Sequence, residues 1–157
     1  MEVNDYLLSH EGLDWHALIE PWRWIFPEEV EFQPWLMNKF GDLTWIDGTG
    51  AVFHLNVSEG TLEKVAENED QFLDLLEDPD NAAEWLMYPL VDMATAAGMT
   101  LENGECFGYE ELPVLGGEYD TANIAIYALD SYWKFCGDMH NKLQDVPDDD
   151  DEEFEEE

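Results

Sequence analysis

The sequence predicts an α+β domain in which an antiparallel β-meander packs against several α-helices, followed by a disordered acidic tail. Three observations favour this class. Short alternating apolar stretches separated by turn sequences lie between residues 43 and 66. Apolar residues recur at helical spacing before and after them. Finally, 45% of the 157 residues are hydrophobic, and 7 Trp, 8 Phe and 6 Tyr are enough to build a core.

The first expected element is a helix over residues 13–26, which Asp14 can cap because its side chain can accept from the first free backbone N–H groups. Pro21 lies inside this pattern and predicts either a kink or an earlier end. The segment between Pro27 and Pro34 is expected to be an irregular connection.

Three strands of a meander are expected next, over residues 43–46, 51–57 and 61–66. The turn between the first two has the sequence D-G-T-G at residues 47–50, a signal typical of hairpins. Residues 58–60 form the second turn. Because these connections are short, the strands are expected to pair in antiparallel fashion.

Helices follow the meander. Asn68 is expected to cap the first of them, with Gln71 at the spacing of a capping box. A longer helix is expected over residues 81–97, bent by Pro89 and ended by Gly98.

The last part of the chain returns to β structure and ends in a helix. Residues 106–109 and 123–127 are expected to be short strands, and residues 113–119 a loop whose paired glycines permit positive φ. Asp130 is expected to cap a final helix over residues 131–143. No linker of domain scale interrupts the sequence, so residues 1–144 are expected to form one domain.

The charge of the chain is its most unusual property. Against 39 Asp and Glu there are only 5 Lys and Arg, a formal net charge of −34. Residues 145–157 contain ten acids and no base, and such a block of like charge predicts a disordered tail. The remaining residues 1–144 still carry a net charge of −24, so the folded body is acidic in its own right.

This charge excludes some partners and favours others. Phosphate affinity comes from Lys and Arg, so neither nucleic acid nor an anionic membrane surface is an expected ligand. A basic protein is the expected partner.

The location is indicated by three observations. No leader-like N-terminus and no run of about 20 apolar residues is present. The two isolated cysteines, Cys106 and Cys136, fit buried free thiols in a reducing compartment. The expected location is the cytoplasm.

The sequence predicts no cofactor, no metal site and no catalytic motif. The serines lie in no nucleophile elbow, and no phosphate-binding glycine loop is present. Cys136 and His140 are one helical turn apart, but two potential ligands do not make a metal site. Pairs of carboxylates are uninformative in so acidic a chain.

Several segments, in this order, resemble a known family. They include F-G-D-L-T-W-I-D at residues 40–47, E-G-T-L-E-K-V-A at 59–66, P-V-L-G-G-E-Y at 113–119 and F-C-G-D-M-H at 135–140. The series, over roughly residues 15–145, resembles a type VI secretion immunity domain, formerly of unknown function and often found beside a GAD-like domain. The chain departs from two-domain members, because it has no room for a full GAD-like domain and adds the acidic tail.

The resemblance implies an antidote that binds and neutralises a toxic effector, commonly one that degrades DNA, delivered between Gram-negative bacteria. The charge agrees, because a nuclease needs a basic groove to hold phosphates and an acidic protein can occupy it. Inhibition by stoichiometric binding is therefore expected. The alternatives are an acidic chaperone or nucleic-acid mimic that binds many basic proteins, and a carboxylate-dependent hydrolase.

The residues expected to bind the partner are acids that flank loops. They are Glu59 and Glu63 near the meander, and Glu110, Glu111, Glu118 and Asp120 near the P-V-L-G-G-E-Y loop.

Overall fold

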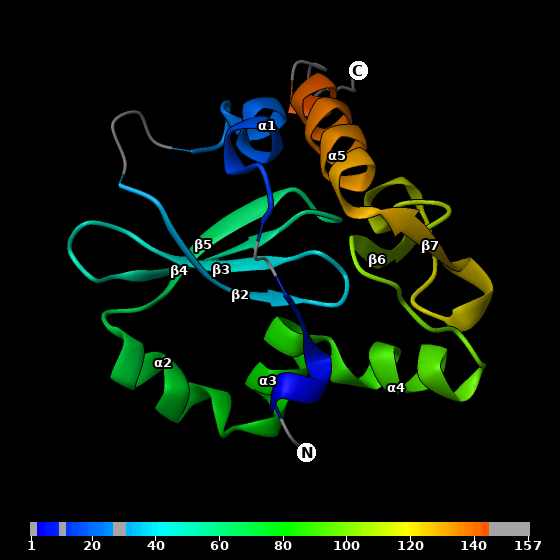
Figure 1. Ribbon diagram of the computed structural model, residues 1–157, viewed down its shortest axis with the longest axis horizontal. Coiled ribbons are helices and arrows are strands. Elements are labelled where there is room, and N and C mark those ends of the chain that lie inside the picture. Colours follow the sequence, from blue (N-terminus) through cyan, green and yellow to red (C-terminus); the bar gives the residue numbers. More distant parts are fainter. Residues whose placement is uncertain (1–2, 10–11, 27–30, 145–157) are drawn as a thin grey trace, which may run out of the picture.

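The computed structural model describes residues 3–9, 12–26 and 31–144, which form two antiparallel sheets covered by helices (Figure 1). The larger sheet has the order β1-β2-β3-β4-β5, with β1 at Leu7–Leu8, β2 at Gln33–Asn38, β3 at Leu43–Ile46, β4 at Val52–Asn56 and β5 at Thr61–Ala66. The smaller sheet pairs β6 (Glu105–Tyr109) with β7 (Ile124–Ala128). The predicted α+β class is confirmed, whereas the predicted acidic tail, residues 145–157, lies outside the described residues.

Helices pack on both faces of the larger sheet. They are α1 (Trp15–Ile19), α2 (Glu69–Leu76), α3 (Pro79–Leu86), α4 (Tyr88–Ala96) and α5 (Leu129–Gln144). Short 3₁₀ turns lie at Val3–Tyr6, Glu20–Trp22, Pro113–Leu115 and Thr121–Asn123. Figure 1 shows α1 and α5 on one side of this sheet and α2 and α3 on the other. Within the described ranges, no helix has the length and apolar character needed to cross a bilayer.

The meander is confirmed. Strands β3 and β5 have the predicted bounds, and β4 is one residue shorter at each end than predicted. Leu43 pairs with Leu55 across β3 and β4. The D-G turn closes with a bond from Gly50 N to Asp47 O of 3.1 Å, and the Asp47 carboxylate accepts from Thr49 N at 2.9 Å.

Strand β2 was not predicted, and the expectation of an irregular segment between Pro27 and Pro34 was wrong at Gln33, where β2 begins. Pro34 lies inside β2, where the register with β3 shifts between Pro34 and Leu36. A bulge of this kind tolerates proline because the missing N–H is not needed by the ladder there. Residues 27–30 lie outside the described part of the chain.

Proline marks the end or interruption of two predicted helices, the first by the earlier end that was one of the two expected outcomes. The first stops at Ile19, and Pro21 lies in the 3₁₀ turn that follows. The second is broken rather than bent, because Met87 adopts a left-handed conformation (φ 57°) between α3 and α4. Pro89, in the first turn of α4, has no N–H to bond the carbonyl four residues earlier, that of Trp85. That carbonyl accepts instead from Asn38 Nδ2 at 3.0 Å.

The F-G-D segment (residues 40–42) and Lys39 before it connect the larger sheet to β6 and α5. Gly41 O accepts from Trp133 Nε1 at 2.8 Å, and Lys39 O accepts from Phe107 N of β6 at 2.8 Å. The buried Asp42 carboxylate accepts from Val57 N at 3.0 Å and from Asn38 Nδ2 at 3.1 Å. This part of the resemblance therefore rests on residues that build the fold.

The buried Asp42 makes stability depend on pH. Desolvation raises the pKa of its carboxyl to about 7, although Asn38 and Val57 donate hydrogen bonds to it. Between about pH 4 and pH 7 the folded chain keeps a proton that the unfolded chain has released, so the contribution of Asp42 to stability is lost as pH rises through that window, by up to about 1.4 kcal/mol per pH unit. Urea unfolding across this range is expected to show a shallower pH dependence for Asp42→Asn than for the wild type. Equal slopes would contradict this.

Candidate functional site: an acidic pocket

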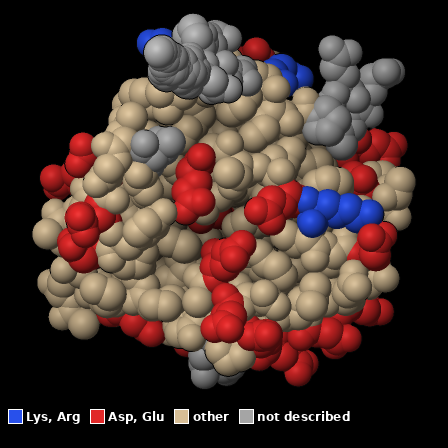
Figure 2. All heavy atoms as spheres, turned by 180° about the vertical axis from the view of Figure 1, so that it is seen from behind, with Lys and Arg blue, Asp and Glu red and all other residues tan. Residues whose placement is uncertain are grey.

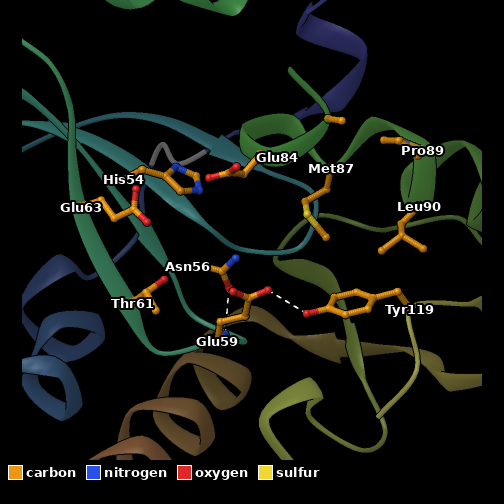
Figure 3. A pocket seen from close by; sticks show the side chains of 11 residues that line it. His54, Asn56, Glu59, Thr61, Glu63, Glu84, Met87, Pro89, Leu90 and Tyr119 are labelled. Atoms are coloured by element: carbon orange, nitrogen blue, oxygen red, sulfur yellow. Dashed lines mark hydrogen bonds between the residues drawn. The ribbon is translucent and has the colours of Figure 1, made fainter. Parts of the chain in front are cut away.

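A pocket of about 420 Å³ lies between β4 and β5, the junction of α3 and α4, and the loop that carries Tyr119 (Figure 3). We call it the acidic pocket. The side chains that line it are His54, Asn56, Glu59, Thr61, Glu63, Ala83, Glu84, Met87, Pro89, Leu90 and Tyr119.

Strand pairing places one wall of the pocket. His54 of β4 lies opposite Glu63 of β5, and Asn56 lies opposite Thr61. Residues two apart on a strand face the same side, so these four side chains share one face of the sheet. The turn that follows adds Glu59, whose N–H donates to Asn56 Oδ1 at 2.9 Å.

The break between α3 and α4 forms the opposite wall. Glu84 belongs to the last turns of α3, and Met87, Pro89 and Leu90 lie at or just after the break. Figure 3 shows the Glu63 and Glu84 carboxylates on either side of the His54 ring. The sequence predicted one bent helix here, whereas the break places Met87 between two separate helices, where it lines the pocket.

The P-V-L-G-G-E-Y loop brings Tyr119 to the pocket. A side chain on Gly117 would collide with the carbonyl of Glu111, so only glycine fits this approach. Asn123 Nδ2 donates to Glu111 O and to Glu118 O, each at 2.9 Å, and holds the loop in place. The Tyr119 hydroxyl donates to Glu59 Oε2 at 2.8 Å, and partial burial together with this bond raises the pKa of Tyr119 to about 12.

His54 is the one lining residue with an unpartnered buried polar atom among those described. Its side chain is only 6% exposed, and Nδ1 lies 3.1 Å from Thr44 Oγ1. Nε2 has no hydrogen-bond partner. Desolvation lowers the pKa of the ring to about 4, so His54 is neutral at physiological pH.

The electrostatic character of the pocket follows from its lining. Three carboxylates, from Glu59, Glu63 and Glu84, line it, and no Lys or Arg does. The ion pairs that the described residues form are local and exposed: Arg23–Glu20, Lys64–Glu67 and Lys134–Asp138. Figure 2 shows a face of the molecule on which Asp and Glu far outnumber Lys and Arg and flank a hollow near its middle.

The structure brings together only some of the acids predicted to bind a partner. Glu59 and Glu63 both line the acidic pocket. Glu118 and Asp120 flank Tyr119, and the Asp120 carboxylate accepts from Ala122 N at 2.9 Å. Glu110 and Glu111 follow β6, are exposed, and do not line the pocket. A role for any of the six in binding stays a prediction.

Glu84 and His54 were not among the residues predicted from the sequence to bind a partner. Glu84 is separated from the meander by a helix, so only tertiary packing places it opposite β5. His54 and Asn56 are two residues apart in the sequence, which is the spacing of side chains on one face of a strand, but this signal gave no indication of what would face them.

The other side chains that could take part in chemistry are buried or hydrogen-bonded within the fold. Cys106 and Cys136 are free and buried, and burial raises the pKa of the Cys136 thiol to about 12. His140 Nε2 lies 3.0 Å from Ser58 O. Over residues 3–9, 12–26 and 31–144, no group of three or more His, Cys, Asp or Glu is arranged to hold a metal ion.

The described residues thus form an α+β fold with a pocket lined by carboxylates and apolar groups. Residues 66–140, from the end of β5 into α5, match the model of a family described as T6SS immunity protein Tdi1, C-terminal. The predicted resemblance to a type VI secretion immunity family is therefore confirmed over this segment, which is slightly less than half of the chain. The F-G-D-L-T-W-I-D segment lies before the match. No curated protein and no solved structure gave a significant match to the chain.

Proposed function

We propose that this protein neutralises a basic, nucleic-acid-cleaving effector by binding it stoichiometrically. The match of residues 66–140 to a type VI secretion immunity family supports this role, because such a protein has a cognate effector as partner. The observation that carries the finer proposal is the acidic pocket, where three carboxylates meet without a Lys or Arg in the lining.

The chemistry of nucleases supplies the reason for a basic partner. An enzyme that cleaves nucleic acid holds phosphates with Lys and Arg, so its substrate groove is positive. A protein with a net charge of −34 is attracted to such a groove over a long range. Occupying it excludes the substrate, so inhibition requires no chemical step by the immunity protein itself.

The contact surface extends over the acidic pocket and the loop beside it. Glu59 and Glu63 line the pocket, and Glu118 and Asp120 lie on either side of Tyr119. Glu110 and Glu111, exposed after β6, would extend the same acidic surface. The buried free thiols fit a reducing compartment, so we place the protein in the cytoplasm.

Co-expression with the effector encoded beside it tests this proposal. The wild-type chain is expected to restore growth and to co-purify with that effector as a single complex. Failure to bind or to protect against any neighbouring effector would contradict the proposal. Salt-labile capture of many unrelated basic proteins, without protection, would favour the acidic chaperone or mimic instead.

A further inference from the structure

We propose that the acidic pocket receives one arginine side chain of the effector, held between Glu63 and Glu84 and against the unpartnered nitrogen of His54. This inference rests on the proposed function, because it names the group on the basic partner that this site recognises. It also gives a role to His54 and Glu84, which form no part of the sequence-based prediction.

Around the buried His54 ring, the pocket presents hydrogen-bond acceptors to a ligand. We assign the His54 proton to Nδ1, which donates to Thr44 Oγ1 at 3.1 Å, so Nε2 presents a lone pair. A buried acceptor without a partner is costly, and the described residues supply none for it. The two neighbouring carboxylates are acceptors as well (Figure 3). A ligand with several donors and a positive charge satisfies all three groups at once.

Guanidinium fits this arrangement better than ammonium. Its five donors lie in one plane and can reach two carboxylates and a ring nitrogen together. It is also more weakly hydrated than the lysine ammonium group, so less solvation is lost when it is buried.

The rest of the pocket suits the stem of the same side chain. Met87 and Leu90 form an apolar wall, and the ring of Tyr119 lies across from Glu59 (Figure 3). Long cationic side chains bury their methylene groups against such surfaces, and arginine also stacks on aromatic rings. A cavity of about 420 Å³ is small for a ligand site, which suits one side chain rather than a helix or strand.

A small probe tests the pocket without the effector. N-acetyl-L-arginine methylamide is titrated into the full chain, and the Met87 methyl and His54 ring signals are followed by NMR. Saturable shifts at both residues are expected, with at least about tenfold weaker binding of the lysine probe and no saturable binding of the neutral citrulline probe. Equal responses to all three probes would overturn the proposal.

Charge-matched variants show whether these carboxylates act specifically. Glu63→Gln with Glu84→Gln is expected to abolish saturable arginine binding. Asp74→Asn with Glu77→Gln removes the same charge from exposed positions on and just after α2, outside the pocket lining, and is expected to leave binding within about twofold of the wild type. Equal loss in both variants would overturn the proposal. All four positions are exposed, and unchanged thermal midpoints would show that the variants fold.

The same variants in the complex separate this inference from the proposed function. The Glu63→Gln, Glu84→Gln variant is expected to bind the cognate effector at least about 100-fold more weakly than the wild type, because losing one partner of a charge pair that is buried in the complex raises the dissociation rate. Wild-type affinity in this variant would overturn the arginine pocket and leave the proposed function intact. If the wild type does not bind the effector, the proposed function is overturned, and so is the proposal that the pocket receives an arginine of that effector.

Discussion

Raising the salt concentration from about 0.02 M to about 0.5 M is expected to slow association of the protein with its effector by about 100-fold or more. The reason is the net charge of −34, which attracts a basic partner over distances that low salt does not screen. At about 0.5 M the Debye length falls to a few ångströms, and only contact interactions survive. Stopped-flow mixing of the purified proteins at several salt concentrations measures this directly.

The dissociation rate serves as the internal control for this experiment. Desolvated contacts such as those proposed for the acidic pocket are screened much less than surface charges, so dissociation is expected to change far less than association. An association rate that does not depend on salt would mean that long-range attraction plays no part, and would contradict the assignment of a basic partner.

Replacing Trp133 with alanine is expected to lower the free energy of unfolding by about 3–5 kcal/mol. Trp133 is fully buried, and its Nε1 donates to Gly41 O at 2.8 Å. Its ring packs edge-on against Trp15 and Trp22, and its backbone carbonyl accepts from Trp22 Nε1 at 3.0 Å. Removal leaves a large cavity and an unpaired carbonyl where α5 meets the F-G-D segment.

Phe135→Ala is the matched control, because Phe135 lies on the same helix but is 48% exposed. Its loss is expected to cost about 1 kcal/mol or less, since little buried area disappears. Urea unfolding of both variants measures the difference. Similar losses for the two variants would contradict the assignment of Trp133 to the centre of the core.

The meander was predictable because its signals are local. Asp47 and Gly50 form a turn whose hydrogen bonds lie within a few residues, and the flanking strands are short, largely apolar stretches. Strand β2 was not predictable in the same way. It pairs with β3, which follows it directly, and with β1, which lies about 25 residues earlier in the sequence. Pro34 is also unfavourable in a regular strand, and only the register shift beside it in the structure explains why it is tolerated.

The sequence indicated two of the three carboxylates that line the acidic pocket, but not the third and not His54. Glu59 and Glu63 could be chosen because they lie at a turn and on a strand next to it, where acids are exposed. Glu84 could not, because its position opposite β5 depends on the break at Met87, which the sequence predicted only as a bend. The unpartnered nitrogen of His54 depends on tertiary contacts that no sequence pattern specifies.

Titration of the purified effector with this protein tests the central claim most directly. Cleavage of DNA by a fixed amount of effector would be measured as the protein is added in steps. The account predicts that activity falls in a straight line and reaches zero at one equivalent. Activity that persists at a large excess, or that disappears at a small fraction of one equivalent, would contradict neutralisation by stoichiometric binding.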